Sequence, residues 1–167
     1  MTVTYALTAL LVVLMLAGGG LLTDIGEWYR LLRKPPWNPP NWLFAPAWTT
    51  ILCLAGWSGA IAWTKAEHLG ARPLLAVVAG LVIFFHLLWS PLFFKLKRPD
   101  LSLIEIPFLW LSVLAAVIAV ARISLPAAAL LLPYLVWVAF ATVLNLAIVR
   151  LNAPFAQARP PTTAPHT

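Results

Sequence analysis

Residues 42–64, WLFAPAWTTILCLAGWSGAIAWT, decide the fold class of this chain. The stretch carries no charged residue and is long enough to cross the roughly 30 Å hydrocarbon core of a bilayer as a helix. Trp42 and Trp63 stand near its two ends, about 31 Å apart along a helix. Because indoles prefer the two headgroup layers of a membrane, the stretch is predicted to be a transmembrane helix.

Four further apolar stretches of similar length lie at about residues 3–22, 72–94, 100–121 and 125–149. The whole chain is 62% hydrophobic and 10% charged, whereas soluble domains carry about 25% charged residues. We therefore expect an all-α integral membrane protein, a five-transmembrane-helix bundle in a single domain over residues 1–152. The first stretch lacks the basic n-region of a signal peptide and is interpreted as a retained helix. The Pro- and Thr-rich tail, residues 153–167, is predicted to be disordered.

The basic residues lie between the apolar stretches, which fits membrane topology better than nucleic-acid binding, despite the net charge of +6. With five spans, one side holds loops one and three and the tail, and carries eight basic residues: Arg30, Arg33, Lys34, Lys95, Lys97, Arg98, Arg150 and Arg159. The other side carries three: Lys65, Arg72 and Arg122. The positive-inside rule then predicts that the first loop and the C-terminus are cytoplasmic.

The first connection, residues 23–41, has the sequence TDIGEWYRLLRKPPWNPPN and is predicted to be structured. Asp24 and Glu27 have the spacing of a capping box at the start of a short helix. That helix would present Ile25, Trp28, Tyr29 and Leu32 on one side. The prolines that follow favour a rigid, extended backbone, so we expect this loop to act as a lid over an apolar surface.

Prolines punctuate the predicted spans. Pro73 and Pro126 stand at helix starts, where a missing N–H does no harm. Pro46, Pro91, Pro107 and Pro133 fall inside spans and are predicted to kink them.

Aromatic and polar side chains recur at helical spacing on three spans: Phe44, Trp48, Ile51, Leu52 and Ala55; His86, Trp89, Ser90 and Phe93; and Tyr134, Trp137, Ala141 and Asn145. Trp57 faces away from Trp48. Such stripes are typical of packing faces. They also fit a pocket for a flat apolar ligand, since ligand sites are mostly apolar with a few placed polar groups.

Two ionisable residues fall inside the predicted spans. His86 is interpreted as a hydrogen-bonded interhelical residue, because a haem site with two histidines needs a second one and His68 lies in a loop on the other side. Glu105 is interpreted as the partner of the basic segment at residues 95–98 in an interfacial ion pair, in preference to a proton relay. Cys53 is the only cysteine and is expected to pack as a small hydrophobe. No catalytic constellation or metal-ligand spacing is present in the sequence, so we expect no metal site and no obligatory cofactor.

Three blocks of sequence resemble the TspO/MBR family (tryptophan-rich sensory protein, translocator protein). They are WYRLLRKPPWNPPNWLFAPAW at residues 28–48, WSPLFF at residues 89–94 and PYLVWVAFATVLNLAIVRLN at residues 133–152. The resemblance runs from about Glu27 to Asn152. It implies a five-helix bundle, often a homodimer and here expected to be bacterial, which binds porphyrins such as protoporphyrin IX and, in many members, sterols or benzodiazepine-type drugs. It also implies a role in tetrapyrrole regulation, stress response or transport.

Family positions and the aromatic stripes together give the expected ligand-binding residues: Tyr29, Trp37, Phe44, Pro46, Trp48, His86, Trp89, Ser90, Phe93, Tyr134, Trp137 and Ala141. The resemblance also implies an alternative, light-driven porphyrin degradation through pocket tryptophans as in some members, in which Trp48 and Trp137 would act. Two departures matter. The family usually has Asn at His86, and its weak sterol pattern places a tyrosine at Leu146, so we rank porphyrin above sterol. A small-molecule transporter is a further alternative, although inverted repeats are not evident. Ala76 and Gly80 form a small-residue pair that would permit close contact in a dimer.

Overall fold

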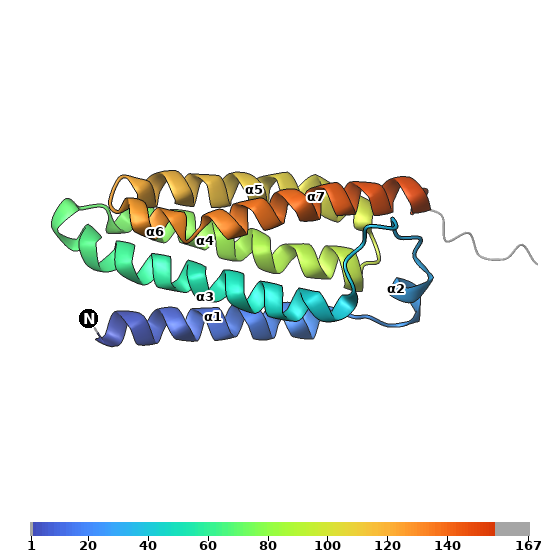
Figure 1. Cartoon of the computed structure of the whole chain (residues 1–167), viewed down its shortest axis with the longest axis horizontal. Coiled ribbons are helices and arrows are strands. Elements are labelled where there is room, and N and C mark those ends of the chain that lie inside the picture. Colours follow the sequence, from blue (N-terminus) through green and yellow to red (C-terminus); the bar gives the residue numbers. More distant parts are fainter. Residues whose placement is uncertain (1, 156–167) are drawn as a thin grey trace, which may run out of the picture.

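The computed structural model describes residues 2–155, and all of its regular elements are helical. In chain order they are α1 (Thr2–Leu22), α2 (Glu27–Leu31), α3 (Asn41–Lys65), the 3₁₀ helix η1 (Ala66–Leu69), α4 (Arg72–Ser90), the π-helical turn η2 (Pro91–Lys95), α5 (Pro99–Ala121), α6 (Leu125–Ala129) and α7 (Leu132–Asn152). The long helices lie side by side, and α2 sits at the end of the bundle opposite the N-terminus (Figure 1).

Five segments of the described chain are long and apolar enough to cross a membrane: Thr2–Leu22, Asn41–Leu69, Arg72–Lys95, Pro99–Ala121 and Leu125–Asn152. They coincide with the five predicted spans, so the five-helix transmembrane architecture is confirmed. The tail from residue 156 lies outside the described residues. Just before it, Phe155 packs against a cluster that includes Tyr29 and Phe93.

The prolines set several helix boundaries. Pro73 and Pro126 lie in the first turns of α4 and α6, as predicted. Pro46 and Pro107 lie inside α3 and α5.

One proline prediction needs correction. Pro133 does not kink a continuous helix but begins a new one, α7, because a proline ring clashes with the carbonyl four residues earlier, here Ala129, where α6 ends. The fifth crossing is therefore two helices. At Pro91 the helical path continues, but α4 gives way to the π-helical turn η2.

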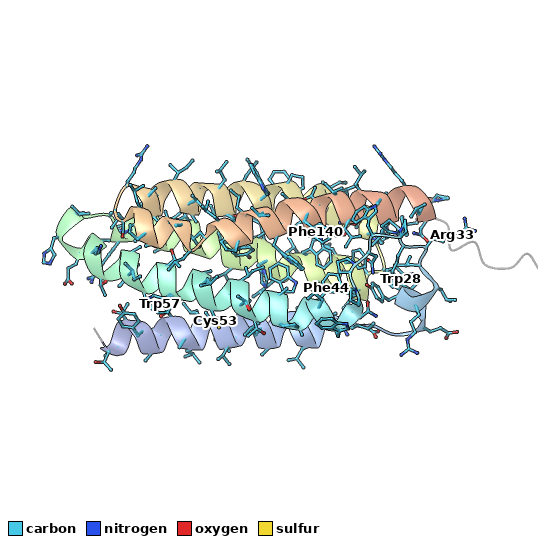
Figure 2. The ribbon with its side chains drawn as sticks, in the orientation of Figure 1. Trp28, Arg33, Phe44, Cys53, Trp57 and Phe140 are labelled. Carbon is cyan, nitrogen blue, oxygen red and sulfur yellow. The ribbon has the colours of Figure 1, made fainter. Side chains whose placement is uncertain are left out.

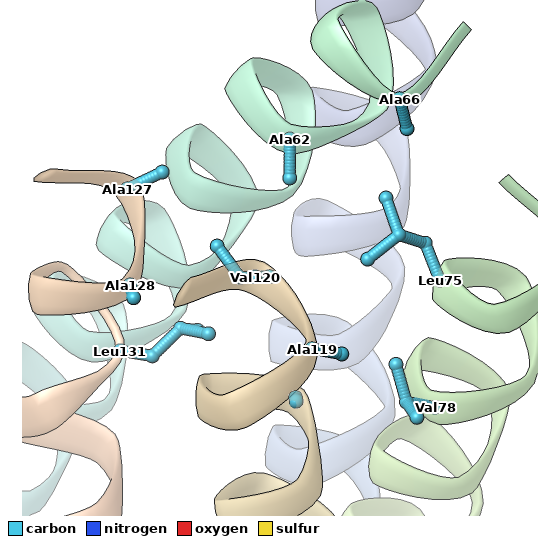
Figure 3. Packing of buried hydrophobic residues seen from close by; sticks show 10 residues of the cluster. Ala62, Ala66, Leu75, Val78, Ala119, Val120, Ala127, Ala128 and Leu131 are labelled. Carbon is cyan, nitrogen blue, oxygen red and sulfur yellow. The ribbon is translucent and has the colours of Figure 1, made fainter. Parts of the chain in front are cut away.

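One end of the bundle, where α3 turns into α4 and α5 into α6, is packed mostly with small side chains. We call it the alanine end, and its buried residues are Ala62, Ala66, Leu75, Val78, Ala116, Ala119, Val120, Ala127, Ala128 and Leu131 (Figure 3). Ser58 donates a buried hydrogen bond of 2.7 Å to the carbonyl of Ala127. Small residues let helix backbones approach closely, which is the usual means of packing helices in lipid.

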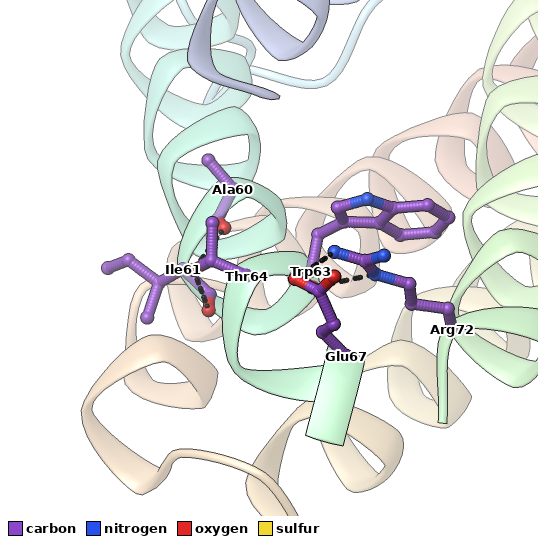
Figure 4. Close-up of polar contacts among 6 residues, drawn as sticks. All are labelled: Ala60, Ile61, Trp63, Thr64, Glu67 and Arg72. Atoms are coloured by element: carbon purple, nitrogen blue, oxygen red, sulfur yellow. Dashed lines mark hydrogen bonds and ion pairs between the residues drawn. The ribbon is translucent and has the colours of Figure 1, made fainter. Parts of the chain in front are cut away.

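The turn between α3 and α4 is held by a small polar group. Arg72 Nη2 lies 2.9 Å from Glu67 Oε2, and the guanidinium lies over the Trp63 ring, 5.3 Å from its centroid (Figure 4). Gly70 ends η1 with φ of 62°, a left-handed conformation that favours glycine. Trp63 thus lies at a helix end, as an interfacial ring should.

Helix α1 is peripheral. It packs against α3 and α4, and only Met15 of its residues is buried. A Cβ atom added at Gly56 of α3 would lie 2.5 Å from Val12 Cγ2, so glycine is what allows α1 to approach α3 here.

Candidate ligand-binding site

Four rings from three helices meet in the interior of the bundle. Trp48 of α3 makes edge-to-face contacts with His86 of α4, at 4.9 Å between ring centroids, and with Tyr134 and Trp137 of α7, at 5.9 and 6.1 Å. Such T-shaped pairs each contribute about 0.5–1.5 kcal/mol beyond their burial. Three of the predicted aromatic stripes therefore converge on one place.

His86 and Tyr134 form the polar centre of this group. The Tyr134 hydroxyl and His86 Nδ1 share a hydrogen bond of 2.9 Å, and both residues are buried. The expectation of a hydrogen-bonded interhelical histidine is thus confirmed. Within residues 2–155 there is no group of three or more His, Cys, Asp and Glu side chains that could hold a metal ion.

A second layer of rings lies between this group and α2. Trp89 stacks on Phe93 at 4.9 Å, and Tyr29 of α2 lies 5.5 Å from Phe94. Trp28 meets Phe93 edge-on at 6.0 Å. We call the two layers together the aromatic end. Figure 2 shows Trp28, Phe44 and Phe140 gathered toward it, whereas Trp57 lies away from them.

The first loop is structured and covers the aromatic end, as expected. Its own side chains Tyr29 and Leu32 are buried. Its helix is shorter than predicted, because α2 has only five residues, and Ile25 remains exposed. The predicted capping box is wrong. Gly26 is the N-cap, and Asp24 Oδ1 instead accepts a hydrogen bond of 2.9 Å from the Gly26 N–H.

The loop is clasped to the far end of the chain. The Arg33 N–H donates to Asn152 Oδ1 at 2.8 Å, and Asn152 Nδ2 donates back to the Arg33 carbonyl at 2.8 Å. Nearby, the Lys34 ammonium donates to the carbonyls of Tyr29 and Leu32 and lies 4.2 Å from the centre of the Tyr29 ring. Partial burial lowers the pKa of Lys34 from its usual value. Trp37 meets Phe140 of α7 edge-on at 6.0 Å.

An apolar groove of about 660 Å³ runs between α3 and α7 on the outside of the ring cluster. Its lining residues are Leu43, Pro46, Ala47, Thr50, Ile51, Pro133, Val136, Trp137 and Phe140. Trp137 belongs both to this groove and to the interior cluster, where it also meets Phe44 at 6.0 Å. Trp137 therefore lies between this groove and Trp48.

Glu105 does not form the predicted ion pair. Its side chain is buried, with 6% of its surface exposed, and neither carboxylate oxygen has a hydrogen-bond partner in the described chain. Arg98 pairs instead with Asp100, at 2.8 and 2.6 Å. The prediction failed because Glu105 lies on the same face of α5 as Ser102, Leu109 and Ser112, which all point into the bundle.

Residues 6–151 match the profile of the TspO/MBR family. This chain belongs to the TspO/MBR family. It is 38% identical to the tryptophan-rich protein TspO of Chlorobaculum tepidum, over 81% of this chain and 87% of the relative. It is also 38% identical to the tryptophan-rich sensory protein of Cereibacter sphaeroides, over 80% of this chain and 82% of the relative. It is 38% identical to the translocator protein of Bos taurus, over 71% of each chain.

As a TspO/MBR protein with five membrane-crossing segments, the chain is an integral, multi-pass membrane protein. The residues that the family resemblance suggested as ligand-binding fall into three places. Trp48, His86, Tyr134 and Trp137 form the interior cluster, and Ala141 packs beside it. Tyr29, Trp89 and Phe93 lie in the second layer, and Ser90 is buried at the end of α4. Phe44 and Trp37 rest on α7 rings, and Pro46 lines the groove.

Four features of this region were not predicted from the sequence. Phe94 adjoins Phe93, and Phe140 lies three residues after Trp137, so helical spacing would have found both. The inward direction of Glu105 follows from its spacing to Ser102. Asn152 gave no signal, because its partner is the backbone of a distant loop.

Proposed function

We propose that this TspO/MBR protein is a membrane receptor or regulator that binds a flat, apolar ligand of the porphyrin type at the aromatic end. The observation that carries the proposal is the double position of Trp137, which lines the 660 Å³ groove and also contacts Trp48. A planar ligand that enters the groove from the bilayer meets the face of this indole first. Rotation of the Trp137 ring then extends the site toward Trp48, His86 and Tyr134.

The chemistry of the lining fits such a ligand. The groove is almost wholly apolar, with Thr50 as its one polar lining residue, and the hydrogen-bonded pair of His86 and Tyr134 lies further inside. Mostly apolar walls with a few fixed polar groups are typical of ligand sites. Protoporphyrin IX and related tetrapyrroles rank above sterols because Leu146 replaces the tyrosine of the weak sterol pattern. Benzodiazepine-type molecules share the flat apolar character. Relatives named tryptophan-rich sensory protein and translocator protein agree with a role in sensing or transport.

Tryptophan quenching by protoporphyrin IX tests the proposal. Trp137→Ala removes a ring from the site and should weaken binding about ten- to hundredfold, as expected for about 1.5–3 kcal/mol of lost contact. Trp57→Ala is the matched control, since Trp57 is 62% exposed and faces away from the cluster. Both variants are checked for folding in the same detergent. Equal affinities in the two variants would contradict the site.

A second candidate function is light-driven porphyrin degradation. The geometry that favours it is the contact of Trp48 and Trp137 at 6.1 Å, with one ring on the groove and one inside. Illumination of the purified protein with protoporphyrin IX tests it by absorbance. A new, protein-dependent product that disappears in Trp137→Phe supports degradation, and bleaching identical to that of free porphyrin contradicts it.

Orientation in the membrane is also a proposal. The eight-to-three distribution of basic residues favours a cytoplasmic C-terminus and first loop in a bacterial membrane. A reporter fused after Thr167 should therefore behave as cytoplasmic, and a reporter active only in the periplasm would reverse the assignment.

A further inference from the structure

A second cavity lies beside α2, at the end of the bundle opposite the N-terminus, where Figure 2 also places Trp28. Its volume is about 470 Å³, which is within the range of ligand sites. It shares no lining residue with the groove between α3 and α7. Its walls include two acids, Asp24 and Glu27, and one base, Lys97. This cavity is therefore distinct from the groove in both place and charge.

The three charges at this cavity are not neutralised within the described chain. The ion pairs of residues 2–155 use other side chains, so neither acid is paired with Lys97. The two acids come from the α1–α2 connection and the first turn of α2, whereas Lys97 comes from the turn before α5. Opposite charges that line one cavity without meeting each other are complementary to a ligand that carries both a cation and an anion.

The backbone holds Lys97 in a fixed position. Its φ is 54°, a left-handed conformation that a side chain other than glycine adopts at a cost in free energy. The turn is held on both sides, because the Leu96 N–H donates to the Pro91 carbonyl at 2.9 Å and the Arg98 N–H donates to the Leu92 carbonyl at 3.1 Å. Lys97 therefore projects its ammonium from a constrained turn.

The cavity lies at the depth of the lipid headgroups. Asp24 follows the end of the first membrane-crossing segment by two residues, and Lys97 precedes the start of the fourth by two. Trp28 lines the cavity, and indoles prefer this layer of a membrane. Leu31 also lines it with 75% of its surface exposed, so an apolar contact lies next to the charges. The site therefore has the polarity of a phospholipid, with charged groups beside an apolar edge.

The cationic half of the ligand is best a primary ammonium. An ammonium has three N–H donors, which can be shared between the two carboxylates, whereas a trimethylammonium has none. A quaternary group is usually bound by open aromatic faces. Here the rings are occupied with one another, because Tyr29 lies 5.5 Å from Phe94 and both are buried, and Trp28 meets Phe93 edge-on at 6.0 Å.

We propose that this cavity is a binding site for the headgroup of a phospholipid that carries a primary ammonium, as in phosphatidylethanolamine. Asp24 and Glu27 accept hydrogen bonds from the ammonium, Lys97 donates to the phosphate, and the exposed Leu31 contacts the start of an acyl chain. The site is separate from the one proposed for a flat ligand, and it holds α1, α2 and the turn before α5 to one lipid.

The test compares three phospholipids with identical acyl chains. Phosphatidylethanolamine, phosphatidylcholine and phosphatidylglycerol are each titrated into the purified full-length protein in detergent, and native mass spectrometry gives the dissociation constant of the first bound lipid. The ethanolamine lipid should bind about tenfold more tightly than the other two, as expected for charge-assisted hydrogen bonds to its ammonium. Water-soluble glycerophosphoethanolamine, which has no acyl chain, should compete at least about tenfold more weakly.

Variants that preserve shape assign the preference to its residues. Glu27→Gln and Asp24→Asn should each reduce the preference for ethanolamine, and the asparagine can still accept the hydrogen bond from the Gly26 N–H. Lys97→Asn should weaken all three lipids by the same factor, because all have the phosphate, and asparagine tolerates the left-handed conformation. Lys95→Asn is the matched control, since Lys95 is exposed but does not line the cavity. Thermal unfolding shows that each variant is folded.

Equal binding of the three lipids, or tighter binding of phosphatidylglycerol, would overturn the inference, because attraction by the basic residues of this side would then be sufficient. So would a preference that survives both acid substitutions, or a loss in Lys95→Asn equal to that in Lys97→Asn. Competition by glycerophosphoethanolamine at the affinity of the lipid itself would show that the site takes a soluble compound and is not a lipid site.

Discussion

The alanine end and the aromatic end of this bundle are packed by opposite means. At the alanine end, residues such as Ala62, Ala66 and Ala127 are fully buried, and a serine hydroxyl reaches the backbone of the facing helix. At the aromatic end, rings meet mostly edge to face, with centroids 4.8–6.4 Å apart. Three side chains of the described chain, Asn38 of the covering loop, Trp89 and Glu105, keep buried polar atoms without a hydrogen-bond partner. The buried serine of the alanine end is hydrogen-bonded within the protein, whereas the aromatic end keeps buried polar atoms that have no partner in the described chain.

The difference separates the parts of the helices that hold the bundle together from the parts at which we propose that a ligand binds. In lipid, helix association depends on close van der Waals packing and interhelical hydrogen bonds, which small residues permit. Large rings keep the helices apart and can rotate about their side-chain bonds without moving the backbone. We therefore expect substitutions at the alanine end to change stability alone, and substitutions at the aromatic end to change ligand binding as well.

The largest effect on stability is expected from Ala62→Leu. Ala62 has no exposed surface, so the larger side chain must push α3 away from its neighbours. Overpacking of this kind costs about 1–3 kcal/mol. Ala139→Leu makes the same change on the exposed face of α7 and should have almost no effect. Thermal unfolding in detergent measures both, and equal midpoints would show that the alanine end is not closely packed.

A somewhat smaller loss of stability is expected from Tyr134→Phe. The change keeps the ring but leaves His86 Nδ1 buried without its partner, which costs about 1–2 kcal/mol. Tyr5→Phe, on the exposed surface of α1, is the matched control. The same unfolding experiment applies. If Tyr134→Phe proves as stable as the control, the hydrogen bond does not connect α4 to α7.

Asn152→Ala should act on the lid and leave the bundle itself intact. It removes both hydrogen bonds to the Arg33 backbone, which together contribute about 1 kcal/mol at this partly exposed position. Ligand release should become about fivefold faster, and Trp37→Ala should change it in the same direction. Stopped-flow quenching measures the dissociation rate, with Leu151→Ala as control. An unchanged rate in Asn152→Ala would mean that the loop does not limit release.

The smallest effect on the bundle is expected from Gly80→Leu. Ala76 and Gly80 are exposed on α4, and nothing lies within 4 Å of a Cβ added at Gly80. The variant should fold normally, but its larger side chain would separate two copies that meet along this face in a homodimer. Analytical ultracentrifugation in detergent should show a shift from dimer to monomer. A dimer of unchanged strength would exclude this face.

How far the sequence predicts this molecule depends on the range of the interactions. Apolar length located all five crossings, because hydrophobicity along a segment is a local property. Helical spacing is also local, and it placed Trp48, His86, Tyr134 and Trp137 on the inward stripes of their helices. The family resemblance then grouped these residues into one expected site. The break between α6 and α7 was not predicted, since a proline inside a span can either kink a helix or end it, and at Pro133 the preceding helix ends.

The errors concern direction and distance. Glu105 lies close to a basic segment in sequence. However, its side chain lies on the buried face of α5 and points into the bundle, away from that segment. The groove between α3 and α7 depends on how the two helices lie relative to each other, and the sequence pattern within either helix does not predict that arrangement. The hydrogen bonds between Asn152 and Arg33 join residues 119 positions apart, and they use the backbone of one partner, which has no sequence signature.

The clasp between Arg33 and Asn152 also has a consequence for how the protein is made. The lid is among the first parts of the chain to leave the ribosome, and its anchor is among the last. Until α7 has been inserted, the segment from Arg33 to Trp37 has neither Asn152 nor Phe140 to rest on. The cover of the proposed binding site is therefore completed only when α7 has been synthesised, so a nascent chain that stalls before its last helix leaves the aromatic end uncovered.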